Sequence, residues 1–130
     1  MKFRTSLSGS EFEIPDEWWA FADMKLFDRR GDFYYYGGYP ESAQAMVVAL
    51  DDVEPPVRTG GSPLFRKYKL LPVLFALTSP ECHLPPVVVT HLTQRSAYRF
   101  KVTNGLHRYY ASAAVGFSKL PVVFESTREV

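Results

Sequence analysis

The pattern of hydrophobic and polar positions is clearest in the last third of the chain. Tyr98, Phe100 and Val102 alternate with Arg99 and Lys101, which predicts a half-buried strand over residues 97–103. The spacing of apolar side chains then changes to the helical period over residues 106–116, with Gly116 as the expected end of the helix. The pattern therefore predicts a strand that turns directly into a helix.

Shorter patterns predict the other elements. Apolar runs predict a buried strand at residues 45–50 and further strands at residues 84–92 and 120–124. A helix is expected from Ser62-Pro63 to about Ser79, kinked or split at Pro72, with an apolar stripe of Leu64, Tyr68, Leu71, Leu74 and Phe75.

The N-terminal third has weaker signals. Residues 1–14 are expected to be extended around a turn at residues 8–10. A short helix should start at Pro15 and end near Met24, because proline and acidic residues favour a first turn. Residues 33–36, which are aromatic, are expected to form a short strand between two turns.

Candidate chemistry lies at the predicted strand-to-helix turn, Asn104-Gly105-Leu106-His107-Arg108. The first N–H groups of a helix are unpaired and its N-terminal end is positive, so an anion is stabilised there. Asn104 is a candidate cap, Gly105 allows close approach, and His107 and Arg108 supply donors. The turn predicts a phosphate site, with a purely structural turn as the alternative.

Composition narrows the class of protein. With 130 residues, 46% hydrophobic and 22% charged, the chain is expected to be globular. The longest nearly apolar stretch, Leu70 to Leu77, is too short to span a bilayer, so we expect no membrane segment and a cytoplasmic location. The single cysteine, Cys82, excludes an internal disulfide and fits a reducing compartment.

The net charge of +1 conceals an asymmetry between the two parts of the chain. Residues 1–43 carry five Lys or Arg against eight Asp or Glu, whereas residues 44–125 carry nine against five. The part that contains the predicted phosphate site is therefore mildly basic, which permits a phosphate-bearing partner without requiring one.

Four features follow one another along the chain. An apolar strand leads into Pro55-Pro56-Val57-Arg58, a helix and the strand Leu84-Pro85-Pro86-Val87-Val88-Val89 come next, and the Asn104–Arg108 turn follows with its helix and Leu120-Pro121-Val122. In this order they resemble the ParB/sulfiredoxin superfamily. The resemblance covers about residues 45–124. It implies an α/β fold of the α+β type, a small mixed sheet with packed helices. Residues 1–43 have no counterpart and are expected to form an extension packed on a domain of residues 44–130.

The resemblance also implies a function. Members of the superfamily bind nucleoside triphosphates at this turn, so Gly105, His107 and Arg108 are expected to meet phosphate, with Asn104 beside them. Arg58 and Thr59 are candidates for a second phosphate-contacting segment, with an exposed loop as the alternative. ATP or CTP, with or without Mg²⁺, is the expected ligand, and weak NTPase or nuclease activity and DNA binding are left open.

Departures from the family limit this expectation. Sulfiredoxins carry a catalytic cysteine where this chain has Leu106, so reductase chemistry is not expected. Asn104 stands where many relatives have Asp, which removes a candidate metal ligand or base. The Asp51, Asp52, Glu54 and Glu81 carboxylates are more simply explained as solvated residues, and no residue spacing indicates a metal site.

A non-catalytic function is the alternative. The acidic, aromatic N-terminal region could bind another protein through Trp18, Trp19 and residues 34–36. A fold does not by itself define a function, so both hypotheses stay open at this point.

Overall fold

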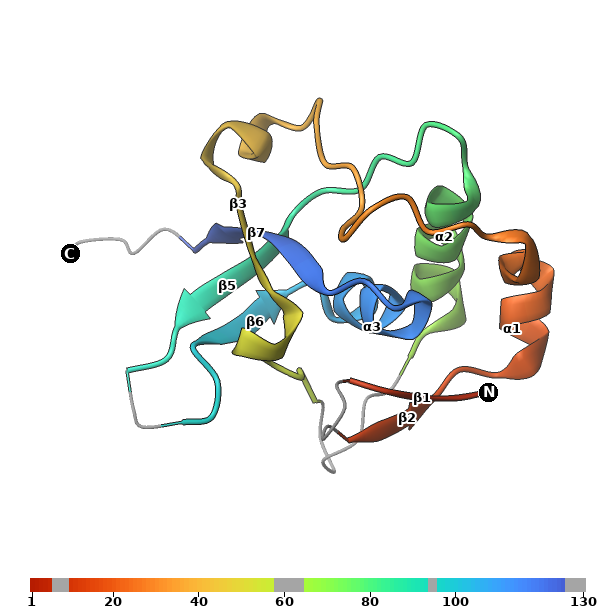
Figure 1. The fold of residues 1–130 in the computed structure, drawn as a ribbon, viewed down its shortest axis with the longest axis horizontal. Coiled ribbons are helices and arrows are strands. Elements are labelled where there is room, and N and C mark those ends of the chain that lie inside the picture. Colours follow the sequence, from red (N-terminus) through yellow and green to blue (C-terminus); the bar gives the residue numbers. More distant parts are fainter. Residues whose placement is uncertain (6–9, 58–64, 94–95, 126–130) are drawn as a thin grey trace.

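The computed structural model describes residues 1–5, 10–57, 65–93 and 96–125. These residues form a mixed α/β fold with a two-stranded and a five-stranded sheet (Figure 1). The elements are β1 (Lys2–Arg4), β2 (Glu11–Glu13), α1 (Asp16–Phe21), β3 (Met46–Ala49), β4 (Val53–Glu54), α2 (Lys67–Thr78), β5 (Val87–His91), β6 (Phe100–Asn104), α3 (Leu106–Val115) and β7 (Lys119–Phe124), with short 3-10 helices at Met24–Leu26, Pro40–Gln44 and Leu50–Asp52. The predicted fold class, a small mixed sheet with packed helices, is confirmed.

The larger sheet has the strand order β3-β7-β5-β6-β4. Strands β5 and β7 are parallel, as are β4 and β6, whereas β5 and β6, and β3 and β7, are antiparallel. The predicted alternation holds in β6, because Phe100 and Val102 are buried and Lys101 is exposed. Buried Leu120 and Val122 in β7 and Val87 and Val89 in β5 form the sheet's part of the core.

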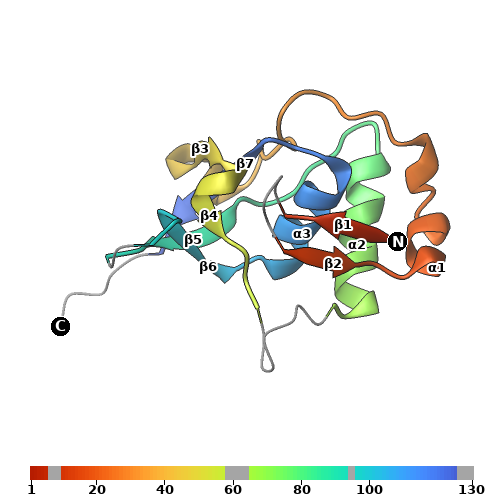
Figure 2. The same cartoon turned by 60° about the horizontal axis from the view of Figure 1, so that its bottom comes forward.

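The helices are stacked outward from the sheet. Figures 1 and 2 both show α3 between the sheet and α2, with α1 on the far side of α2. Helix α3 buries Tyr109 and Tyr110, and it ends as predicted at Gly116, whose φ of 91° suits a residue without a side chain. Among the described residues, no helix is long and apolar enough to cross a bilayer.

The N-terminal hairpin packs over α3 (Figure 2). The Phe12 ring lies 4.8 Å from the Tyr110 ring, edge to face, and the Phe3 ring lies 4.8 Å from that of Trp19. Residues 1–43 thus contribute to the same core as α3. Their division from residues 44–130 as a separate extension stays a prediction.

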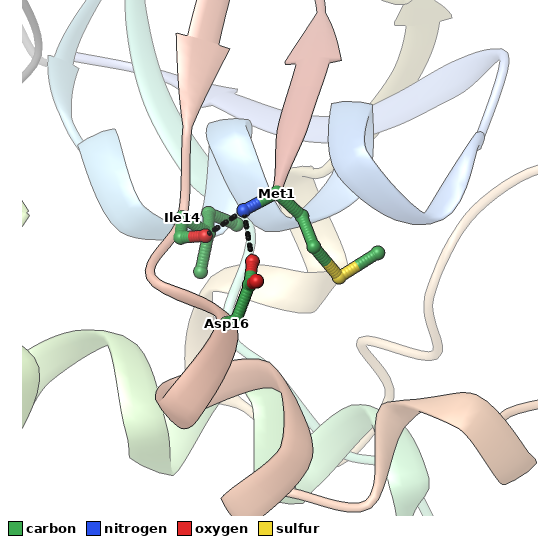
Figure 3. A network of polar contacts seen from close by, with 3 residues as sticks. All are labelled: Met1, Ile14 and Asp16. Atoms are coloured by element: carbon green, nitrogen blue, oxygen red, sulfur yellow. Dashed lines mark hydrogen bonds and ion pairs between the residues drawn. The ribbon is translucent and has the colours of Figure 1, made fainter.

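A small polar network fixes where the hairpin and α1 begin (Figure 3). The Met1 ammonium group donates a hydrogen bond to the Ile14 carbonyl at 2.7 Å and forms an ion pair with the Asp16 carboxylate. Because Asp16 is the first residue of α1 and Met1 precedes β1, the start of the strand is joined to the start of the helix.

Helix α2 differs from its prediction. It is not split at Pro72, and it begins at Lys67, after Arg66 in extended conformation; Ser62, Pro63 and Leu64 lie outside the described residues. Its buried side chains are Leu70, Leu74 and Leu77, spaced four and three apart on one face. Tyr68 and Phe75, which were expected on the apolar stripe, are 66% and 44% exposed.

Two strand predictions also change. Strand β3 is an edge of the sheet, so it is only partly buried, with Met46 and Ala49 exposed. Residues 33–36 form no strand: the Leu84 N–H donates to the Tyr35 carbonyl, but no ladder of backbone bonds follows. The Tyr34 ring is buried in the core instead.

Candidate functional site

The predicted turn lies at the carboxyl end of two parallel strands. Val53 and Glu54 of β4 pair with Phe100 and Lys101 of β6, so the chain leaves both strands at the same edge of the sheet. After β6 it turns at Gly105 into α3, and after β4 it passes through Pro56 and Val57. The Tyr110 hydroxyl donates to the Pro56 carbonyl at 2.6 Å and holds the second segment beside α3.

A pocket of about 410 Å³ opens at this edge. Its walls come from four parts of the chain: the segment after β4, helix α2, the end of β6 and the first turn of α3. The lining residues are Pro56, Val57, Lys69, Val73, Val102, Thr103, Asn104, Gly105, Leu106, His107 and Arg108. The pocket thus contains all four residues that the motif marked at the turn.

The Gly105 position is the start of α3, and glycine is required there for two reasons. Its φ is 124°, a conformation that side-chain-bearing residues rarely adopt. A Cβ atom at this position would lie 3.0 Å from Val87 Cγ1 and 3.1 Å from Arg108 Nη2. The backbone of the turn therefore approaches Val87 and the Arg108 guanidinium as closely as sterics allow.

The Arg108 side chain is partly committed to the fold. Its Nη1 atom donates to the Pro85 carbonyl at 2.9 Å and to the Pro86 carbonyl at 2.8 Å, which fastens the residues before β5 to α3. Burial lowers the pKa of the guanidinium, while the nearby Tyr34 hydroxyl acts in the opposite direction. Arg108 is also one of the residues that line the pocket, and its guanidinium lies behind Gly105, against the carbonyls of the residues before β5.

The His107 side chain is a hydrogen-bond acceptor in this structure. It is 7% exposed, and its Nε2 atom accepts a hydrogen bond from the Arg66 backbone N–H at 3.0 Å. An accepting Nε2 carries no proton, so the neutral ring is protonated on Nδ1. His107 therefore joins the start of α2 to the start of α3, a role that the motif did not indicate.

Asn104 does not cap α3, contrary to the expectation. It is the last residue of β6 and is exposed, and the cap position is taken by Gly105, with no side-chain hydrogen bond to the helix. The first hydrogen bond of the helix runs from the Tyr109 N–H to the Gly105 carbonyl. The N-terminal end of α3 at the pocket thus has no side-chain cap, and its dipole favours an anion.

Among the described lining residues, Lys69 is the charged one that the sequence did not mark as a candidate. It lies on α2, is exposed, and is separated from the turn by more than thirty positions in the sequence. The signal that could have found it is the basic run Arg66-Lys67-Tyr68-Lys69, which begins shortly after the Gly-rich segment beside Arg58 and Thr59. Lys69 is thus a cationic residue that α2 contributes to the lining of the pocket.

The second predicted phosphate-contacting segment lies outside the part of the chain that the structure describes. Arg58 and Thr59 lie outside the described residues, although Pro56 and Val57 just before them line the pocket. Asp51, Asp52 and Glu54 do not line it, and Glu81 borders a different pocket. In the described parts of the chain, no group of three His, Cys, Asp or Glu side chains could hold a metal ion, and Mg²⁺ binding stays a prediction.

The aromatic N-terminal region, the alternative site, is mostly packed inward. Trp18 and Trp19 are half-buried against the core and Tyr34 is 2% exposed, whereas Tyr35 is exposed. Protein binding through this region stays a prediction.

Comparison with known proteins gives one similar structure. No family model matches the sequence, and no curated protein matches it. The C-terminally truncated chromosome-partitioning protein ParB from Caulobacter crescentus, solved in complex with CTP-gamma-S, is similar to 65% of this chain with a TM-score of 0.46 and 16% identity. The match covers 46% of the ParB chain, so this protein spans less than half of that structure. Membership of the ParB/sulfiredoxin superfamily stays a prediction.

Proposed function

We propose that the protein binds the phosphate groups of a nucleotide in the pocket between α2 and the start of α3. The observation that carries this proposal is that Lys69 and an uncapped helix N-terminus border the same open pocket. Both attract anions, and no carboxylate offsets them among the described lining residues. An anion there would meet positive charge from two walls.

The apolar part of the lining favours a nucleotide over free phosphate. Val57, Val73 and Leu106 border the same pocket and offer surface for a base and sugar. Ligand pockets commonly measure about 300–1,000 Å³, and the pocket's volume of about 410 Å³ falls within that range. The resemblance of the sequence motif makes ATP and CTP the first ligands to test.

The turn residues have different roles in this proposal. Leu106, His107 and Arg108 place the first backbone N–H groups of α3 at the pocket, and Arg108 adds its charge behind Gly105. His107 keeps α2, and with it Lys69, in position through the Arg66 N–H. Arg58 and Thr59, which follow Val57, are proposed to contact the same phosphates.

Isothermal titration calorimetry with ATP, CTP and GTP, each with and without Mg²⁺, tests the proposal. We expect binding of at least one nucleotide and a Kd about tenfold higher, about 1.4 kcal/mol, for Lys69→Gln. Lys67→Gln is the matched control, because it removes the same charge from the same helix at a residue that does not line the pocket. Binding should also weaken as salt is added.

Two results would contradict the proposal. One is the absence of heat with all three nucleotides under both conditions. The other is an equal loss of affinity in both lysine variants, which would indicate general attraction to a basic surface rather than a site. Circular dichroism of each variant establishes that it is folded.

The same mixtures test the predicted activity. Weak triphosphatase activity would release inorganic phosphate, which a colorimetric assay measures, and Lys69→Gln should reduce the rate together with the affinity. Incubation with duplex DNA tests the predicted nuclease activity and DNA binding, the latter by a mobility shift that decreases with salt.

A further inference from the structure

A second pocket lies where the segment after α1 meets the segment after α2. Figures 1 and 2 show these segments side by side, and the Arg30 guanidinium joins them by donating to the Pro80 carbonyl at 2.7 Å. The pocket measures about 730 Å³ and shares no lining residue with the proposed phosphate site. It is lined by Phe27, Arg30, Gly31, Asp32, Phe33, Tyr34, Tyr35, Leu77, Pro80, Glu81, Cys82, His83 and Phe117.

The buried part of this lining is apolar and fixed in place. Leu77, Phe117 and Tyr34 are 4%, 5% and 2% exposed. The polar atom of Tyr34 is already satisfied, because its hydroxyl donates to the Pro85 carbonyl at 3.0 Å. A ligand that reached this surface would meet hydrocarbon and an aromatic ring.

The exposed part of the lining carries further rings. Tyr35 is 57% exposed, and its ring lies edge to face with that of His83 at 4.8 Å between centroids. Phe33 is half-buried at the same pocket. Covering such rings with a flat molecule removes apolar surface from water, at about 25 cal/mol per Å².

Charges around the pocket are balanced. The Asp32 carboxylate lies 3.6 Å from the Lys119 ammonium, which offsets its charge. The remaining lining charges are one cation, Arg30, and one anion, Glu81. The lining therefore carries no net charge that would favour an ionic ligand over a neutral one.

We propose that this second pocket binds an uncharged aromatic molecule, held by ring and hydrocarbon contacts rather than by charge. The site is independent of the phosphate pocket, so each can be tested without the other.

Two fluorescent probes that differ by one charge test the class of ligand. N-phenyl-1-naphthylamine is uncharged, and 1-anilinonaphthalene-8-sulfonate has the same rings with an added sulfonate. We expect a saturable rise in fluorescence with the neutral probe that is insensitive to salt, and about tenfold weaker binding of the sulfonate. Tighter binding of the sulfonate, or no saturable binding of the neutral probe, would overturn the proposal.

A pair of variants tests the location. Cys82→Phe places a ring in the pocket and should weaken binding of the neutral probe about tenfold. Met46→Phe, which adds a ring at an exposed position of β3 that lines neither pocket, should leave it unchanged. Equal affinities in the two variants would place the probe elsewhere and overturn the proposal.

Cys82 gives a second measurement that needs no variant. It is the single cysteine of the chain and is half-buried in the pocket wall, so alkylation by iodoacetamide reports on this site alone. Saturating neutral probe should slow the alkylation of the folded wild-type protein. An unchanged rate would overturn the assignment even if Cys82→Phe failed to fold.

Discussion

Gly105 and Arg108 together form the corner between β6 and α3. The guanidinium lies against the backbone of the glycine, and its Nη1 atom holds the carbonyls of Pro85 and Pro86. The corner therefore fixes three things at once: the direction of α3, the entry into β5, and the place of a positive charge behind the pocket. A side chain at position 105 would disturb all of them.

Replacing Gly105 by alanine should lower the free energy of unfolding by about 2–3 kcal/mol, through backbone strain and crowding by Val87. Gly38→Ala is the matched control, because its φ is 90° but no atom lies within 4 Å of the added Cβ. It should cost about 1 kcal/mol, from strain alone. Urea denaturation of both variants measures the difference, and equal losses would show that crowding at Gly105 is unimportant.

The motif marked residues that the structure places together at this corner, but it did not indicate their contacts with the rest of the fold. A glycine before a helix that opens with His and Arg is visible in one short stretch. The bonds from Arg108 to Pro85 and Pro86 and from Arg66 to His107 join residues that are far apart in the chain. They depend on how whole elements pack, which no local pattern contains.

At the scale of elements, α2 and α3 form a unit that shapes the proposed phosphate pocket. His107 on α3 accepts the N–H of Arg66, the residue immediately before α2, and Lys69 follows within the first turn of α2. The position of Lys69 thus depends on the first turn of α3. This hydrogen bond therefore joins the two walls of the pocket.

Pro72 is the weak point of α2. It lies inside a continuous helix, where its missing backbone N–H leaves one helical hydrogen bond unmade. It is also exposed, so its ring adds little packing to the core. Pro72→Ala should raise the free energy of unfolding by about 1–3 kcal/mol, because alanine is the better helix former.

The control for this prediction is Pro80→Ala, an exposed proline just beyond the end of α2, which should change stability by less than about 1 kcal/mol. Thermal unfolding followed by circular dichroism compares the two. A loss of stability in Pro72→Ala would mean that the proline ring makes a contact important for the helix.

At the scale of the whole molecule, the core is rich in buried phenols. Tyr34, Tyr109 and Tyr110 are each at most 2% exposed. Burial raises the pKa of Tyr110 from 10.0 to about 12 and also raises the pKa values of Tyr34 and Tyr109, because a phenolate in the core would lose its hydration. Folding therefore requires these groups to stay protonated.

Stability should consequently fall at alkaline pH. Below pH 10 the phenols are protonated in both states, but between about pH 10 and 12 the unfolded chain releases protons that the folded protein retains, which favours unfolding. Urea denaturation across this range should show a decline that is shallower in Tyr110→Phe than in the wild type. An identical decline in both would exclude Tyr110 as a contributor.

The sequence alone determined the elements whose pattern is local: the alternating strand β6, the turn at Gly105, helix α3 and its end at Gly116. A period of two or of about 3.6 residues is a property of a single segment, so it can be detected without knowing the rest of the fold. The apolar and β-branched runs of β5 and β7 belong to the same class.

Only the tertiary structure decided which segments meet. It put β3 at the edge of the sheet, left residues 33–36 without a strand partner, brought Lys69 to the turn, and opened a second pocket beside Cys82. These outcomes depend on the packing of distant segments against one another. For each segment many packing partners have similar local energies, and one arrangement becomes the most stable only when the whole core is assembled.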